Sequence, residues 1–277
     1  MKASPIFARL AICAMLAASA CYAQEASQRA APIHDLQSII DAKVLRVAVS
    51  RFDLPGFHTH GGNGAIGGVE IDLAQQIGRA LGVTVQFIDD AESFDAVVDL
   101  AATDRADIGI SKLSQTYRRL HRVRFSEPYI TLRHALLFNR AVIAQDPERR
   151  APAAVLEGFS GRLGVIADSA YVDFAKTNFP AASLIEARTW DEVIANLLAG
   201  TVDAIYRDEF EIRRIVKNNP ALNIRLGTAA IVDQDALLSI AICDTCSKLQ
   251  ELINYHLERT RKSLTLNELL ASDQSRK

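Results

Sequence analysis

The feature that most constrains the fold of this chain is a helix–strand pattern that occurs twice. Phe94 precedes Asp107 by 13 residues, and Trp190 precedes Asp203 by the same interval. Each interval has the apolar spacing of an amphipathic helix, and each Asp opens a short apolar strand. Two such units predict two α/β lobes, with ligand-binding groups at the carboxyl ends of their strands, where open α/β sheets form a crevice.

The first half shows the same alternation before Phe94. Short β-branched runs at 44–49 and 83–88 predict two strands. Between them Leu73, Ile77 and Leu81 recur at helical spacing before a glycine, which predicts a helix with a glycine stop.

The first 23 residues have the layout of a secretory signal peptide. Lys2 and Arg9 lead into an apolar run, and small residues follow up to Ala23. We expect cleavage after Ala23 and a soluble periplasmic protein, because no later apolar run is long enough to cross a bilayer. A lipoprotein acylated at Cys21 is the alternative.

Charge and cysteine usage exclude some classes of function. Loss of Lys2 and Arg9 with the leader changes the formal net charge from −2 to −4, and neither value favours nucleic-acid binding. The mature chain keeps Cys243 and Cys246, and a lone CxxC pair in an exported protein predicts a disulfide rather than a metal site. The histidines show no metal-ligand spacing, so we expect neither a metal nor a cofactor.

A candidate anion-binding site follows the strand that begins at Asp107. Arg119 can fork two hydrogen bonds onto a carboxylate, and the hydroxyls of Ser114 and Thr116 can bond the remaining oxygen lone pairs. The alternative interpretation is a solvated basic face, because further cationic residues lie on either side of Arg119.

This segment resembles the bacterial extracellular solute-binding proteins of family 3, the amino-acid-binding components of ABC importers. In that family a hydroxyl-x-Thr-x-x-Arg stretch precedes Phe-Ser-Asp/Glu-Pro-Tyr; here residues 114–119 read Ser-Gln-Thr-Tyr-Arg-Arg and residues 125–129 read Phe-Ser-Glu-Pro-Tyr. The resemblance spans roughly residues 36–272. It implies a type II periplasmic binding protein fold, with two Rossmann-like lobes joined by a hinge of two parallel crossings.

The resemblance also implies limits for the two lobes. We expect lobe one to comprise residues 36–139 and 238–272, and lobe two to comprise residues 140–237. The apolar strands of the hinge are then expected at 135–138 and 237–242.

The resemblance implies further ligand-binding residues. In the family an acidic residue just past the second-lobe strand binds the ligand's α-ammonium; Asp208 has this place, although it can also be the N-cap of a helix over 209–217. A carboxylate on Arg119 and an ammonium on Asp208 would make closure of the lobes depend on ligand. Phe94 matches an aromatic that packs on the ligand side chain, and Phe52 and Asp53 are candidates at the first strand end.

Two departures from the family pattern affect the ligand. Lys112 occupies a position that the family fills with Gly, where it could attract an acidic side chain or fill the pocket. Asp168 and Ser169 replace a Gly-Ser or Gly-Thr pair whose backbone N–H groups meet the carboxylate. Ser169 stays a candidate contact, and the ligand stays open beyond a small amino-acid-like carboxylate.

The sequence therefore predicts a monomeric binding protein that presents its ligand to the membrane subunits of an ABC permease. One alternative is an exported enzyme similar to cyclohexadienyl dehydratases, with Glu211 as general acid if burial raises its pKa. The pattern favours an exposed Glu211 paired with Arg214, and hence no catalytic residue. Another alternative is a sensor that has kept the fold and lost its pocket.

Overall fold

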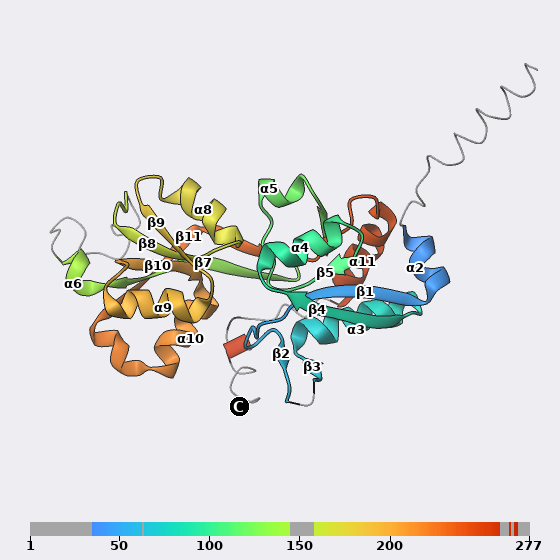
Figure 1. Ribbon diagram of the computed structural model, residues 1–277, viewed down its shortest axis with the longest axis horizontal. Coiled ribbons are helices and arrows are strands. Elements are labelled where there is room, and N and C mark those ends of the chain that lie inside the picture. The colour runs from blue at the N-terminus through green and yellow to red at the C-terminus, as the bar shows by residue number, and fades with distance from the viewer. Residues whose placement is uncertain (1–34, 63, 145–157, 261–265, 267–268, 271–277) are drawn as a thin grey trace, which may run out of the picture.

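The protein folds into two lobes, each built on a five-stranded sheet (Figure 1). The computed structural model describes residues 35–62, 64–144, 158–260, 266 and 269–270, so the predicted leader lies outside the described residues. The first sheet has the order β4-β1-β5-β12-β6, and the second has the order β11-β7-β10-β8-β9. The strands of the first sheet are β1 (Val44–Ser50), β4 (Thr84–Ala91), β5 (Ile108–Gly109), β6 (Arg124–Phe125) and β12 (Ala241–Ile242). Those of the second are β7 (Ile130–Asn139), β8 (Arg162–Ile166), β9 (Ser183–Ala187), β10 (Ala204–Asp208) and β11 (Leu226–Leu238).

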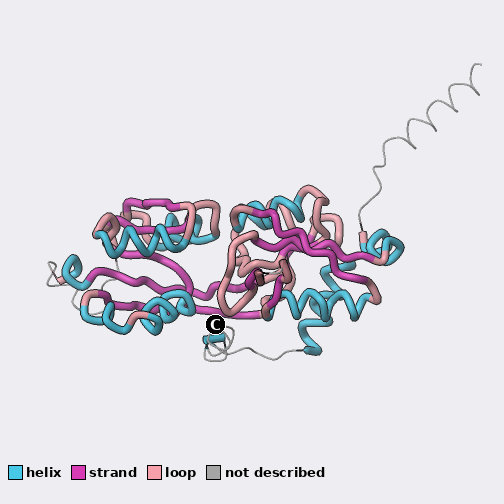
Figure 2. Tube along the Cα trace, turned by 60° about the horizontal axis from the view of Figure 1, so that its bottom comes forward, coloured by secondary structure: helices cyan, strands magenta, loops and turns pink. Residues whose placement is uncertain are grey.

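Helices lie above and below the strands in both lobes (Figure 2). They are α2 (Leu36–Ala42), α3 (Val69–Leu81), α4 (Phe94–Ala102), α5 (Tyr117–Leu120), α6 (Arg140–Ile143), α8 (Ala170–Asn178), α9 (Trp190–Ala199), α10 (Glu209–Asn218), the 3-10 helix η2 (Pro220–Ile224) and α11 (Ser247–Thr260). A small hairpin of β2 (Thr59–His60) and β3 (Ile66–Gly67) precedes α3. Among the described residues, none of the helices has the length and apolarity needed to span a membrane.

The predicted repeat is present in the structure. Elements β1, α3, β4, α4 and β5 correspond in order to β8, α8, β9, α9 and β10, and in both sheets the first strand lies between the other two. Phe94 and Trp190 are the first residues of α4 and α9. Both helices are capped by a hydroxyl, because Ser93 accepts from the backbone of Ala96 and Thr189 accepts from the backbone of Glu192.

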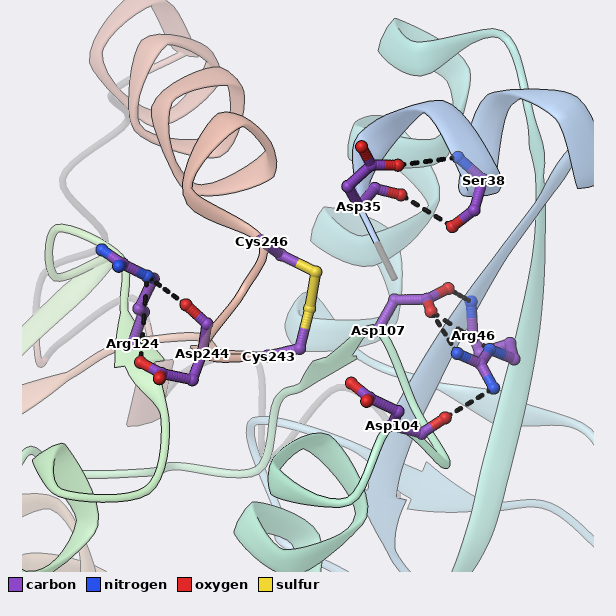
Figure 3. The surroundings of a disulfide bond; sticks show 9 residues. All are labelled: Asp35, Ser38, Arg46, Asp104, Asp107, Arg124, Cys243, Asp244 and Cys246. Carbon is purple, nitrogen blue, oxygen red and sulfur yellow. Dashed lines mark hydrogen bonds and ion pairs between the residues drawn. A yellow bond between two sulfur atoms is a disulfide. The ribbon is translucent and has the colours of Figure 1, made fainter. Parts of the chain in front are cut away.

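The two aspartates of the repeat make equivalent contacts. Asp107 accepts hydrogen bonds from the backbone N and Nη2 of Arg46 at 2.6 Å each (Figure 3). Asp203 accepts from the backbone N of Arg162 at 2.8 Å and from its Nη2 at 2.7 Å. Hydrogen bonds from Arg162 lower the pKa of the Asp203 carboxyl below its usual range. Each Asp thus ties the start of the third strand to the first strand of its unit.

Two long strands, β7 and β11, pass between the lobes (Figure 1). Ile130 pairs with Leu238 at one end of the ladder and Asn139 pairs with Leu226 at the other, with an irregularity between Ala230 and Asp235. The expectation of parallel crossings was wrong: the pairing is antiparallel, because the chain leaves lobe one along β7 and returns along β11.

These two strands make the hinge that we propose. Residues 134–138 of β7 pair with β10 in the second sheet, which favours a first lobe limit near residue 133 rather than 139. Lobe two then begins near residue 134, and the other limits that we propose are those predicted from the sequence, with lobe two ending at 237 and 238–272 returning to lobe one.

A disulfide joins Cys243 and Cys246, as predicted (Figure 3). Both cysteines are buried in an apolar cluster with Ile242 of β12 and Leu249 of α11. The disulfide therefore constrains the short connection between β12 and α11.

Candidate functional site

A small cavity lies between the lobes, at the carboxyl ends of β5 and β10, where the repeat predicts the crevice. Its volume is about 10 Å³, which is room for about one water molecule. Six of its lining residues are predicted site residues, and four were not predicted. The predicted ones are Phe94, Lys112, Ser114, Arg119, Ser169 and Asp208, and the others are Ala170, Tyr171, Arg207 and Leu238.

Arg119 lies on the short helix α5 and is 2% exposed, so it is not part of a solvated basic face. Its Nε donates to Asp95 Oδ1 at 2.9 Å, and its Nη1 donates to the carbonyl of Ser114 at 2.9 Å. Burial raises the pKa of the Asp95 carboxyl, but Arg119 and Arg118 outweigh burial and the net pKa is lowered. The Arg119 guanidinium, which we expected to bind a ligand carboxylate, is therefore already paired with the Asp95 carboxylate.

The side chain of Lys112 extends from lobe one to acidic residues of lobe two. Its Nζ lies 3.1 Å from Asp208 Oδ2 and 2.9 Å from Glu211 Oε1, and its side chain is 1% exposed. The residue has φ of 47°, in the left-handed region that favours glycine. The Lys112 ammonium thus pairs with Asp208, the residue that the resemblance assigned to a ligand ammonium.

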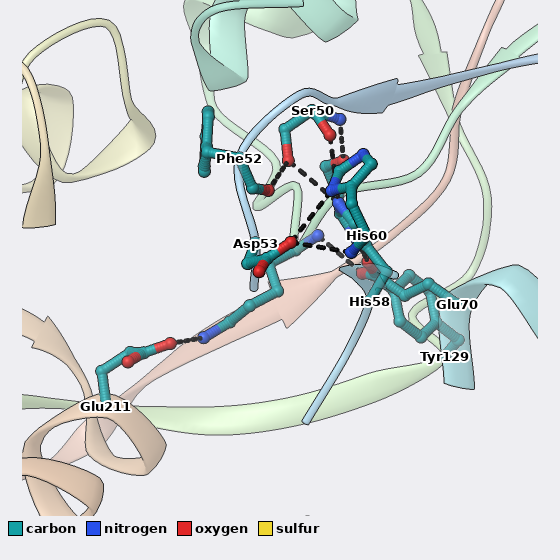
Figure 4. A network of polar contacts seen from close by, with 10 residues as sticks. Ser50, Phe52, Asp53, His58, His60, Glu70, Tyr129 and Glu211 are labelled. Atoms are coloured by element: carbon teal, nitrogen blue, oxygen red, sulfur yellow. Dashed lines mark hydrogen bonds and ion pairs between the residues drawn. The ribbon is translucent and has the colours of Figure 1, made fainter. Parts of the chain in front are cut away.

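A buried polar network fixes the backbone of Lys112 (Figure 4). Glu70 Oε1 accepts from the Lys112 backbone N at 2.7 Å and also from the Tyr129 hydroxyl. Glu70 Oε2 lies 2.8 Å from His58 Nδ1, and His58 Nε2 lies 3.0 Å from Ser50 Oγ. The hydrogen bonds join Ser50, His58 and Glu70 in the sequence of a catalytic triad. Each of these residues is at most 1% exposed and none lines the cavity, so we interpret the network as structural.

Asp208 and Glu211 lie at the start of α10. Asp208 Oδ1 accepts from the backbone N of Glu211 at 3.1 Å, which confirms the predicted N-cap. The expectation of an exposed Glu211 was wrong, because it is 2% exposed and bonds both Arg214, at 2.9 Å, and Lys112. Burial raises the pKa of Glu211, but the nearby cations Lys112, Arg214 and Arg207 outweigh burial and bring the pKa to about 2.

Arg207 is the main site residue that the sequence did not indicate. Its guanidinium lies 5.0 Å from the ring centre of Phe94, 5.2 Å from that of Trp190 and 5.6 Å from that of Tyr171. Such distances give cation–π attraction. Phe94, the candidate to pack on a ligand side chain, lines the cavity and packs on Arg207. The repeat contained a signal, because it makes Trp190 the counterpart of Phe94 and so a second candidate aromatic at the crevice.

Three predicted residues do not line the cavity. Asp53 accepts from the backbone N of His60 at 2.8 Å and pairs with its ring, so its carboxylate is used within the loop before β2 (Figure 4). The rings of Phe52 and Phe94 meet edge to face, with their centres 5.2 Å apart. Thr116 caps α5 by accepting from the backbone N of Arg119 at 3.3 Å.

Ser169 lines the cavity, but its hydroxyl is bonded within its own lobe. Its Oγ donates to the carbonyl of Ile166 at 2.7 Å. Asp168, before it, has φ of 50°, and its carbonyl accepts from the backbone N of Asp95 at 3.1 Å. The backbone here therefore contacts the other lobe directly.

Further contacts join the lobes around the cavity. Arg118 Nε lies 3.1 Å from Asp173 Oδ2 on α8. The rings of Phe57 and Phe210 meet edge to face at 5.3 Å. Together with the Lys112 ion pairs, these contacts hold the lobes against each other on several sides of the cavity.

Comparison with known proteins places the chain among binding proteins. A sequence family described as bacterial extracellular solute-binding proteins, family 3, matches residues 45–272. ABC transporter arginine-binding protein 1 of Escherichia coli (strain K12) is 24% identical over 223 residues, which cover 79% of this chain and 86% of that protein.

Solved structures show the same two-lobed fold. An amino acid ABC transporter substrate-binding protein from Streptococcus pneumoniae Canada MDR_19A, bound to L-arginine, has a TM-score of 0.68 and 24% identity, with 86% of this chain and 98% of that one covered. An ancestral amino acid-binding protein, described as a precursor of cyclohexadienyl dehydratase, has a TM-score of 0.64 and 24% identity over 85% of this chain and 97% of that one. The fold predicted from the sequence is confirmed.

Proposed function

Because the chain belongs to the bacterial extracellular solute-binding proteins of family 3, we propose that it binds a small carboxylate between its lobes and delivers it to the membrane subunits of an ABC permease. The relatives named above are amino-acid-binding proteins of ABC transporters, which supports an amino-acid-like carboxylate as the starting class. The predicted leader supports a periplasmic location, and we propose a monomer.

The observation that carries this proposal is the buried guanidinium of Arg119 on the wall of the cavity between the lobes. Its Nη2 lies 2.8 Å from Asp95 Oδ1 but makes no hydrogen bond within the described part of the chain, so it retains capacity to donate. Charge-assisted hydrogen bonds from a desolvated Arg bind carboxylates strongly. Ligand binding has to widen the gap between the lobes, because the cavity holds about one water.

A thermal-shift screen of the purified protein against amino acids and small carboxylates tests this function. A ligand at 100 times its Kd adds about 2.7 kcal/mol to the free energy of unfolding, which raises the melting temperature. Arg119→Lys keeps the charge and loses the planar fork, so we expect it to weaken binding of the active compound by roughly 30-fold or more, about 2 kcal/mol.

Arg105→Lys is the matched control, because Arg105 is 64% exposed and pairs with Asp90 far from the cavity. It should bind like the unchanged protein. Equal affinity in Arg119→Lys and Arg105→Lys would reject Arg119 as the ligand receptor. A flat screen would favour the sensor that has lost its pocket.

We also propose that the protein is not an enzyme, although an ancestral neighbour is described as the precursor of a dehydratase. A general acid at neutral pH needs a raised pKa. The pKa of Glu211 is instead lowered to about 2 by its cationic neighbours, so it holds no proton to donate at neutral pH. Formation of product from prephenate by the purified protein would contradict this part of the proposal.

A further inference from the structure

The first feature that constrains the ligand is the pairing of Lys112 with both acidic groups of lobe two. Asp208 and Glu211 each lie within 3.1 Å of its ammonium, and all three side chains are at most 2% exposed. Glu211 is further paired with Arg214. A ligand ammonium can reach these carboxylates only by displacing Lys112, which would leave a buried cation without its partners.

A second cation of the protein fills the aromatic part of the site. The side chain of Arg207 is 4% exposed, and its guanidinium lies within 5.6 Å of the ring centres of Phe94, Trp190 and Tyr171. A cationic ligand side chain would compete with Arg207 for these same rings. Like charges in one desolvated pocket repel each other, so such a ligand is disfavoured.

The buried side-chain atoms around the cavity that make no hydrogen bond can all donate one. Within the described residues they are Nε and Nη1 of Arg207, the Tyr171 hydroxyl, Nη2 of Arg119 and Nε1 of Trp190, whose ring packs on Arg207. Two of these atoms lie near a carboxylate without a hydrogen bond to it: Nη2 of Arg119 is 2.8 Å from Asp95 Oδ1, and Nε of Arg207 is 3.5 Å from Asp208 Oδ2. The carboxylates of Asp95, Asp208 and Glu211 each already accept hydrogen bonds or ion pairs. A buried donor without an acceptor is costly, so the site favours a ligand that brings acceptors.

From these contacts we infer that the ligand is a small anion without a cationic group, such as a short mono- or dicarboxylate lacking an α-amino group. The inference rests on the proposed function, since it names the ligand class of the same cleft. Arg119 and Arg207 supply the charge for the anion, and Lys112 keeps Asp208 and Glu211 from repelling it.

Pairs of acids that differ only in the amino group provide the test. Succinate and L-aspartate form one pair, propionate and L-alanine form another, and L-arginine adds a cationic side chain. Isothermal titration calorimetry of the unchanged protein should show at least one carboxylate with a Kd tenfold or more below that of its α-amino counterpart, and no heat with L-arginine. An amino acid that binds as tightly as its partner carboxylate would overturn the inference without any variant.

Lys112→Gly tests the cause of this preference. Glycine suits a φ of 47°, and the change frees Asp208 and Glu211 for a ligand ammonium. We expect L-aspartate or L-alanine to bind this variant at least tenfold more tightly than they bind the unchanged protein. Lys248→Ala is the control, because it removes one positive charge from an exposed pair with Glu251 on α11. It should leave every affinity unchanged.

The outcomes separate the two proposals. If the unchanged protein binds none of the acids while Lys112→Gly binds an amino acid, the anion inference fails and the binding-protein function stands. If neither protein binds any member of the panel, the proposed function fails as well. If circular dichroism shows that Lys112→Gly is unfolded, the comparison of paired acids on the unchanged protein decides alone.

Discussion

Individual residues in the cleft are held by buried charge pairs. Lys112, Arg119 and Arg207 are each at most 6% exposed, and each faces a carboxylate of the protein. Desolvation penalises every one of these charges, and close partners offset that penalty, so removing one partner is expected to cost about 3 to 5 kcal/mol. The pairs therefore specify the geometry of the site more than they add net stability.

The pH dependence of stability should report the Glu211 pairs. The pKa of Glu211 falls from an ordinary 4.5 to about 2 in the folded protein. A lowered pKa contributes stability that is present above the unfolded pKa and is lost as pH falls through the folded pKa. The charged groups that face it are Lys112, Arg214, Arg207 and Asp208.

We therefore expect Glu211→Gln to lower the free energy of unfolding by about 3 kcal/mol at pH 7, where the unchanged protein keeps the buried ion pairs. The difference between the two proteins should stay constant down to about pH 5 and shrink between pH 4.5 and pH 3. Urea unfolding at pH 7, 5, 4 and 3 measures it. A difference that is the same at pH 5 and pH 3 would show that Glu211 does not have a lowered pKa.

At the scale of elements, Glu70 joins segments that are distant in the sequence. From α3 it bonds Lys112 after β5, Tyr129 before β7 and His58 before β2 (Figure 4). The backbone just before Glu70 is closely packed. A Cβ on Gly68, which has φ of 140°, would lie 2.0 Å from the carbonyl oxygen of Phe57.

Glu70→Ala should therefore destabilise the protein strongly. It leaves three buried groups without their acceptor, and each unsatisfied group costs about 1 to 3 kcal/mol, so we expect a loss of roughly 3 kcal/mol or more. Urea unfolding measures the loss. Glu92→Ala is the control, because Glu92 is 74% exposed and pairs with exposed Arg51, so it should change stability by about 0.5 kcal/mol or less. Similar losses in both variants would contradict a structural role for the network.

The sequence predicted the elements better than it predicted their polar contacts. Apolar spacing and glycine stops located β1, α3, β4 and α4, and the repeat located the crevice, because those signals are local. The direction of pairing between β7 and β11 was wrong, since pairing depends on how the chain returns. The burial of Glu211, the Lys112 bridge and the aromatic cage of Arg207 depend on contacts between residues up to 113 positions apart, and no local pattern encodes them.

At the scale of the whole molecule, the cleft is built from both lobes at once. Lobe one contributes Lys112, Arg119 and Phe94, and lobe two contributes Arg207 and Asp208. A ligand that binds between these groups has to alter contacts across the hinge strands. We therefore expect binding and the relative position of the lobes to be coupled, as the proposed function requires.

The most direct test of binding in this cleft is a fluorescence titration of Trp190, the only tryptophan of the chain, whose ring lies 5.2 Å from Arg207. A compound that raises the melting temperature should change Trp190 emission in a saturable way, with the Kd found by calorimetry. Arg119→Lys should shift the curve to roughly 30-fold higher concentration or more. Unchanged emission at a saturating concentration of such a compound would place its binding site outside the cleft and contradict this account.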